Sequence, residues 1–292
     1  MSTETTNEGM LPNPLRPKDG EINADKPTTD VHRYRKHICI TDSRGFVTHR
    51  DRSPAAIRVD ASEGFIPLWA DGVTLRWRFQ DRGISQYFAD PDRAKAAIQD
   101  LFGDALLAWG DAAPVRFKQD NDSTDFELVM RSADDCDNGG CVLAASFFPD
   151  AGRHTFEMYP RLFTQSRKEQ VDTFIHELGH IFGLRHFFAN ISETQWPSRL
   201  FGRDNPFSIM NYGSMSELTE DDRSDLRRLY RAARSGELTQ IDGARIRLVR
   251  PYHTQGLPQP APVTSNDLLA LAASADEKQP QMLIKGRKIT IE

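Results

Sequence analysis

The residues with the clearest chemical meaning form one short string. His176, Glu177, His180, Gly183 and His186 have the spacing H-E-x-x-H-x-x-G-x-x-H. In a helix, positions i and i+4 lie one turn apart on the same face, so His176 and His180 can direct their imidazoles to one point. A glycine can adopt positive φ and turn the chain sharply, which would bring His186 to the same point. Five fixed positions match by chance on the order of once in ten thousand such chains.

Three imidazoles that converge in this way predict one catalytic zinc ion, held by His176, His180 and His186. Zinc binds nitrogen at about 2.0–2.1 Å in tetrahedral sites, and three protein ligands leave the fourth position open for water. Zinc lowers the pKa of that water towards neutrality. Glu177 is then the expected general base, which takes the proton and passes it to the leaving amine. The string therefore predicts a hydrolytic site.

Capping residues and apolar patterns predict the helices and strands around this string. We expect the ligand-bearing helix over residues 167–182, closed by Gly183, and a second helix over 220–234 with Thr219 as its N-cap. A third helix is expected over 91–109, with Asp90 as N-cap and Gly110 at its end. Alternating or β-rich runs predict strands at residues 73–79, 115–118, 126–130, 142–148, 155–159 and 244–250. This order predicts an α+β fold with a mixed sheet backed by helices.

Composition excludes several classes of protein. The 292 residues carry 37 Lys+Arg and 42 Asp+Glu, a net charge of −5, so no broad nucleic-acid footprint is expected. No run of some 18 apolar residues occurs, which predicts no membrane span. The first twenty residues are polar and lack the apolar stretch of a secretory signal, so a cytoplasmic or non-classically secreted protein is expected from the residues alone. The oligomeric state is left open.

A resemblance to a known family adds to this reading. The string His176–His186 followed by Ser208-Ile209-Met210-Asn211-Tyr212-Gly213 resembles the metzincin zinc endopeptidases. The resemblance implies that Met210 forms a turn beneath the zinc site. It also implies a zincin fold in which the sheet and helices lie over a lower, mostly irregular subdomain with a C-terminal helix. Such enzymes bind an extended protein or peptide substrate along a sheet edge, for which residues 142–146 are the candidate, the alternative being an interior strand.

The subfamily is not settled by these motifs. Residues 140–144 and 147–149 resemble the edge-strand region of matrixins. Tyr212, two residues after Met210, resembles instead the tyrosine of astacins and serralysins, which stabilises the tetrahedral intermediate. The alternative for Tyr212 is a packed side chain with a satisfied hydroxyl. Phe187 stands where astacins carry glutamate, so neither pattern fits fully.

The resemblance also suggests a division of the chain and a compartment. We expect a mobile N-terminal segment over residues 1–60, similar in position to a pro-segment, a catalytic domain over 61–236 and a largely irregular extension over 237–292. Cys39 precedes the catalytic domain, as the inhibitory cysteine of matrixin pro-segments does, but its neighbours do not match that pattern, which favours a buried thiol. Metzincins are mostly extracellular, in conflict with the absence of a signal sequence.

Two further expectations concern metals and cysteines. Calcium sites occur in matrixins, but Asp134, Asp135, Asp137 and Asp150 have no diagnostic spacing, so a Ca²⁺ site is unsupported. Cys136 and Cys141 flank a turn-like loop and either close a small disulfide or remain free thiols.

The function expected from all of these residues is a zinc-dependent metalloendopeptidase that hydrolyses internal peptide bonds. The alternative is a catalytically silent zinc-scaffold protein that binds peptides. Loss of activity in such proteins usually removes the glutamate, and Glu177 is present.

Overall fold

The computed structural model describes most of the chain between residues 57 and 255 and a few shorter pieces. The described residues are 13–18, 57–61, 64–137, 140–186, 198–201, 208–210, 216–255, 283–284 and 287–288. Contacts divide the chain into residues 1–255 and 256–292. In the second unit, β14 (Leu283–Ile284) pairs antiparallel with β15 (Arg287–Lys288). No helix in the described ranges is both long and apolar enough to cross a membrane.

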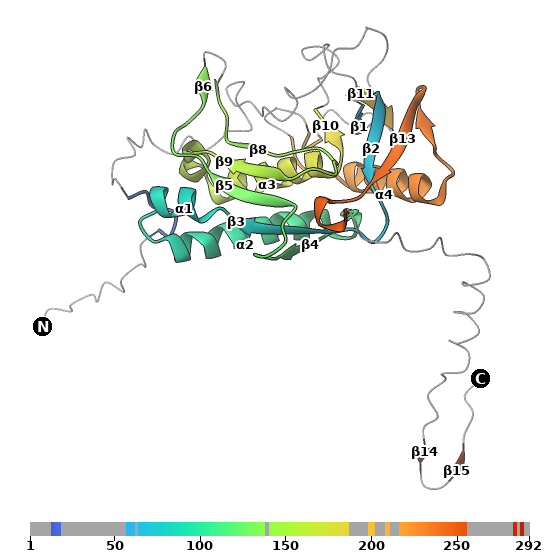
Figure 1. The fold of residues 1–292 in the computed structure, drawn as a ribbon, viewed down its shortest axis with the longest axis horizontal. Coiled ribbons are helices and arrows are strands. Elements are labelled where there is room, and N and C mark those ends of the chain that lie inside the picture. Colours follow the sequence, from blue (N-terminus) through green and yellow to red (C-terminus); the bar gives the residue numbers. More distant parts are fainter. Residues whose placement is uncertain are drawn as a thin grey trace, which may run out of the picture. The chain divides into compact units, whose positions relative to one another are not determined.

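A five-stranded mixed sheet forms the centre of the first unit (Figure 1). Its strands, in spatial order, are β4 (Arg116–Gln119), β3 (Thr74–Phe79), β5 (Phe126–Met130), β9 (His154–Met158) and β8 (Ala144–Ala145). Neighbouring strands are parallel except β8, which runs antiparallel to β9. The predicted mixed sheet is confirmed, and β8 ends it among the strands described. The strand predicted over 142–148 is wrong in length, because only Ala144 and Ala145 pair with β9.

Two helices cover one face of this sheet. They are α2 (Pro91–Trp109) and α3 (Arg167–Ile181). Alternate residues of β3 are buried, as the sequence predicts, and Phe102 of α2 packs against Trp77 of β3. Phe174 of α3 stacks on Phe156 of β9 at 5.1 Å between ring centroids. The aromatic layer between the sheet and the two helices fixes where α3 lies.

The helix termini follow the predicted caps. Asp90 accepts a hydrogen bond from the Arg93 amide at the start of α2, and Gly110 ends it at φ 56°. Helix α4 (Glu220–Ser235) begins with a reciprocal capping box between Thr219 and Asp222 and ends at Gly236 in the left-handed region. The remaining helices are short: α1 (Asp81–Tyr87), η2 (Gly110–Ala112), η3 (Pro160–Thr164) and η5 (Tyr252–Thr254).

Two small sheets bring distant parts of the chain together. In the first, β1 (Ile57–Asp60) lies between β10 (Leu184–Arg185) and β11 (Ser198–Phe201), antiparallel to both (Figure 1). In the second, β13 (Ala244–Val249) pairs antiparallel with β12 (Gln240–Ile241) and parallel with β2 (Phe65–Trp69). A hairpin of β6 (Cys136–Asp137) and β7 (Gly140–Cys141) carries a disulfide between the two cysteines, which answers the question left open by the sequence.

Parts of the predicted mobile segment and of the C-terminal extension are packed. Lys18 donates its amide to Tyr87, and Leu15 is buried. Strand β1 lies within residues 1–60, and β13 lies beyond residue 236. The three-part division of the chain stays a prediction. Strands β1 and β13 belong to the same packed unit as the helices and the central sheet. The sequence also predicts a short strand at residues 37–40 and a weak helix at 266–273, and both ranges fall outside the described residues.

Candidate metal centre

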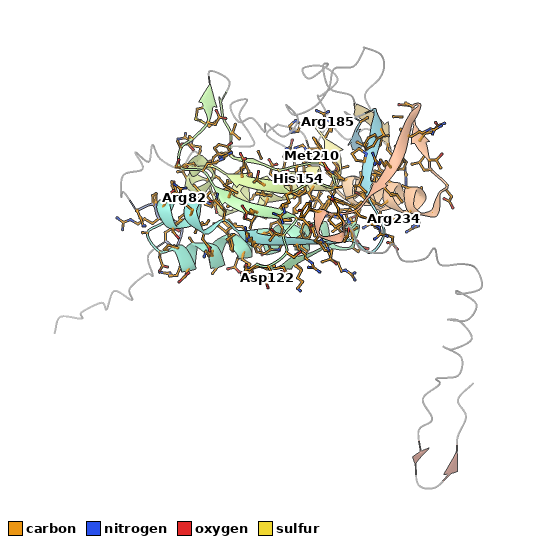
Figure 2. All side chains as sticks on the ribbon, viewed as in Figure 1. Arg82, Asp122, His154, Arg185, Met210 and Arg234 are labelled. Carbon is orange, nitrogen blue, oxygen red and sulfur yellow. A yellow bond between two sulfur atoms is a disulfide. The ribbon has the colours of Figure 1, made fainter. Side chains whose placement is uncertain are left out.

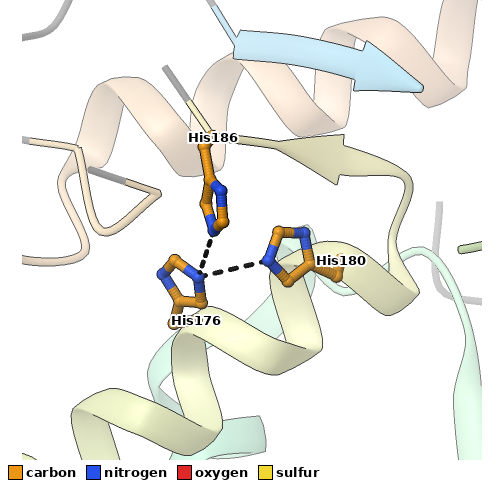
Figure 3. A group of neighbouring side chains, drawn as sticks. All are labelled: His176, His180 and His186. Atoms are coloured by element: carbon orange, nitrogen blue, oxygen red, sulfur yellow. Dashed lines mark hydrogen bonds between the residues drawn. The ribbon is translucent and has the colours of Figure 1, made fainter. Parts of the chain in front are cut away.

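Helix α3 presents the first two histidines of the string. His176 and His180 lie one helical turn apart, and both are buried, with 2% and 0% of their surface exposed. Gly183 turns the chain at φ +90°, and β10 then leads directly into His186, which is fully buried. The structure therefore brings the three predicted ligands together, and their ligand atoms lie within 4.8 Å of one another (Figure 3).

The orientation of the rings fits a metal ion. His176 Nδ1 lies 2.8 Å from the Ile209 carbonyl oxygen, and His180 Nδ1 lies 2.7 Å from that of Leu184. A carbonyl can only accept, so in the neutral ring each Nδ1 carries the proton and each Nε2 carries a lone pair. The Nε2 atoms of His176 and His180 are 3.2 Å apart, and those of His176 and His186 are 3.0 Å apart. Lone pairs that face each other at this distance repel unless a cation lies between them.

The distances also agree with the size of a zinc site. Two nitrogens bound at about 2.0–2.1 Å in a tetrahedral arrangement are roughly 3.3 Å apart. Imidazole nitrogen is a ligand for zinc and related transition metals, whereas Ca²⁺ takes oxygen. Across the ranges that the structure describes, this is the one group of three or more candidate metal ligands. The Ca²⁺ site thus stays unsupported.

Met210, for which the resemblance implies a turn beneath the zinc site, packs against the helix that carries His176 and His180. Met210 is 1% exposed, and a Cβ built on Gly179 of α3 would lie 2.4 Å from its sulfur. Only glycine at 179 lets the methionine approach the helix so closely. The adjacent Ile209 carbonyl is the acceptor for His176. Residues 208–210 therefore both support the helix and orient one ligand.

Helix α4 contacts residues 208–210 through Asp222. Asp222 accepts hydrogen bonds from the amide and hydroxyl of Thr219, and it also lies against the Ser208 hydroxyl and the Ile209 amide. Burial raises the pKa of Asp222, and these hydrogen bonds oppose that rise. The link between α4 and residues 208–210 was not predicted from sequence.

Indole and phenol groups donate to main-chain carbonyls in the C-terminal half of α3 and just after it. Trp109 donates its indole N–H to the Ile175 carbonyl, and Trp69 donates its own to Ile181. Tyr230 of α4 donates its hydroxyl to the Phe182 carbonyl and accepts from the Trp69 amide. These bonds join the ligand helix to α2, β2 and α4.

Further features concern Tyr230 and the main chain near Trp69. Burial raises the pKa of Tyr230, so its hydroxyl stays protonated. Arg234, labelled in Figure 2, donates to the carbonyls of Trp69, Ala70 and Pro114.

The edge of the sheet lies close to the ligand helix. Ser146 donates its hydroxyl to the Glu177 carbonyl at 2.9 Å. The Phe148 and His180 rings meet edge-on, with 5.4 Å between their centroids. The Arg185 guanidinium lies 5.5 Å from the centroid of the Phe148 ring. The predicted edge strand is therefore tied both to the helix and to β10.

The other predicted site residues have different outcomes. Glu177 is 1% exposed and follows His176 directly on α3. Tyr212 and Phe187 lie outside the described residues, so the role of Tyr212 stays a prediction. His253, which is not one of the predicted site residues, binds the Asp125 carboxylate at 2.8 Å and connects η5 to the start of β5.

Comparisons with known proteins agree with this geometry. A family model described as metallo-peptidase family M12, of the reprolysin type, matches residues 89–221, which include α2, α3 and the three histidines. The macrophage metalloelastase of Rattus norvegicus is 27% identical over 172 residues, which cover 55% of this chain. The chain is thus similar to metallopeptidases of the metzincin kind. It spans only about a third of the length of that relative, 35%.

A solved structure of myroilysin also shows some similarity to this chain. The sequences are 14% identical, and the match covers 59% of this chain and 98% of the other at a TM-score of 0.39. The α+β class, the mixed sheet and the histidine triad of the chain follow from its own described residues.

Proposed function

We propose that this chain is a zinc-dependent endopeptidase, with His176, His180 and His186 as the metal ligands. The observation that carries the proposal is the convergence of their Nε2 atoms at 3.0 and 3.2 Å, while two Nδ1 atoms donate to main-chain carbonyls. Hydrogen bonds of this kind to the second ring nitrogen fix the tautomer and orientation of metal-binding histidines. When bound, a zinc ion supplies Lewis-acid chemistry, since it lowers the pKa of water and polarises a carbonyl.

Glu177 is the proposed general base. Its carboxylate takes a proton from the attacking water and returns it to the leaving nitrogen of the cleaved peptide. Burial of Glu177 beside His176 excludes bulk water from the proton transfer. Tyr212 is proposed to donate a hydrogen bond to the developing oxyanion, on the resemblance to astacins and serralysins alone.

An extended peptide is the proposed substrate. Strand β8 is the last strand of the described sheet, and we propose that the substrate lies alongside it as an added strand. The Ser146 hydroxyl holds the end of this strand against the Glu177 carbonyl. Main-chain pairing along β8 would thus fix the substrate relative to the general base. Because such pairing reads no side chains, selectivity would come from pockets beside the strand.

Cleavage of a blocked, internally quenched peptide library by the purified chain tests the proposal. We expect cleavage that a zinc chelator abolishes and that Glu177→Gln lowers by about 10²–10⁴-fold with an unchanged zinc content. Glu169→Gln is the matched control, since Glu169 is a buried acid on the same helix outside the triad. Unchanged hydrolysis in Glu177→Gln would refute the role of this residue. Stoichiometric zinc without turnover would favour the silent peptide-binding scaffold.

A further inference from the structure

The strand that carries the third histidine has its pairing partner far away in the sequence. Strand β10 consists of Leu184 and Arg185, directly before His186. Across the described part of the chain, it pairs with β1, in the register Arg58 with Arg185 and Val59 with Leu184. A two-residue strand has no stability of its own and depends on its partner. The position of β10 therefore depends on its pairing with Arg58 and Val59.

Two of the three histidines depend on this short strand for their positions. The Leu184 carbonyl accepts the Nδ1 proton of His180 at 2.7 Å, so it orients the second ligand. His186 continues from β10 and supplies the third ligand. A shift of β10 would therefore displace one ligand and rotate another. Gly183, at φ +90° just before β10, does not restrain the strand through a side chain.

Strand β1 is built into the interior. Val59 is fully buried, Ala61 is 2% exposed, and both belong to the main hydrophobic core. On its far side β1 pairs with β11 in four residue pairs, from Ile57 with Phe201 to Asp60 with Ser198. Strand β1 is thus the central strand of its sheet, and its removal would leave β10 and β11 without a strand between them.

We propose that residues 57–61 are a positioning element of the metal centre, although they lie at the end of the segment that resembles a pro-segment in position. Loss of this strand weakens metal binding instead of releasing an active enzyme. The proposal rests on the metal site proposed above, which the experiment tests separately. An activating cleavage, where one occurs, would fall before residue 57.

Proline in the centre of β1 tests this directly in the full-length chain. Val59→Pro removes a main-chain donor and disfavours the central strand. Leu248→Pro is a control for proline in another strand, since Leu248 lies in β13, which pairs with β12 and β2 and not with β10. The measurements are the zinc dissociation constant, from competition with a chromophoric chelator, and the visible spectrum of the cobalt-substituted protein. We expect Val59→Pro to weaken zinc binding about 10- to 100-fold and to alter the cobalt spectrum. We expect Leu248→Pro to change the constant by less than about threefold.

A second pair of variants covers the case in which the prolines prevent folding. Val59→Ala and Val73→Ala remove the same two methyl groups from two buried positions, 0% and 5% exposed. Only Val59 lies on the strand that pairs with β10, so only Val59→Ala is expected to weaken zinc binding, by about threefold or more. Equal zinc affinity in a folded Val59 variant and the unmodified chain would overturn the inference. Failure of the unmodified chain to bind zinc would instead overturn the proposed function.

Discussion

The two halves of the candidate metal centre are built in opposite ways. Helix α3 supplies His176 and His180 through its own periodicity, and the aromatic layer of the core holds it in place. Strand β10 supplies His186 after a glycine turn, and its partner β1 comes from more than a hundred residues earlier in the chain. The helical half depends on local geometry, while the strand half depends on a long-range pairing. The metal is the group that would join them.

Removal of a single histidine ligand is expected to have the largest effect on zinc binding by the two halves. His176→Ala and His186→Ala each delete one of three nitrogens, so each should weaken zinc binding more than the roughly 10- to 100-fold typical of changes outside the ligand shell. Chelator competition measures this. His253→Ala is the control, because His253 binds Asp125 and is not part of the triad. Retained affinity in His186→Ala would mean that the strand half does not hold the metal.

Removal of the metal should separate the two halves. In the zinc-free chain, no ion holds the three imidazoles together, and the short strand can move more easily than the core-packed helix. We expect hydrogen exchange at residues 184–185 and 57–60 to accelerate at least about tenfold more than at residues 170–178. Mass spectrometry of the zinc-loaded and zinc-free forms measures the ratio. Uniform acceleration across all three segments would show that the two halves respond as one unit.

A methyl group added to α3 tests how tightly the helical half is supported. Gly179→Ala would place a Cβ 2.4 Å from the Met210 sulfur, so overpacking should lower the free energy of unfolding by about 1–3 kcal/mol. Gly103→Ala in α2 meets nothing within 4 Å and should raise it by up to about 1 kcal/mol. Denaturant titration measures both. A Gly179→Ala protein as stable as the parent would contradict the close approach of Met210.

The smallest expected effect is a change in pH dependence at Asp222. Burial raises the pKa of this carboxyl in the folded protein. As pH rises through the ordinary value of 3.8 towards the higher native value, the unfolded chain loses its proton first, so the free energy of unfolding falls. Asp222→Asn should remove this fall. Denaturation of both metal-free proteins from pH 3 to 6 measures it, and parallel curves would contradict the prediction.

The comparison also explains which features were readable from sequence. Helix α2 was predicted from Pro91 to Trp109 because its caps and buried face are local signals, and the H-E-x-x-H spacing depends only on the helical repeat. The pairings of β1 with β10 and of β13 with β2 were not predicted. A short strand such as Phe65–Trp69 has no alternation and contains Pro67, and its parallel partner lies beyond α4. The predicted edge strand is too long, because only Ala144 and Ala145 pair with β9, while Ser146 and Phe148 contact α3.

The parallel pairing of β2 with β13 has a consequence for biosynthesis. Trp69 pairs with Val249, about 180 residues later in the chain. At about 5–20 residues per second, roughly 10 to 40 s of translation separate the two strands. During that time β2 emerges from the ribosome without its neighbour and exposes an unpaired edge that other nascent chains can join. A stop codon placed just after α4 would make that exposure permanent. We therefore expect a chain without β13 to aggregate more readily than the full chain.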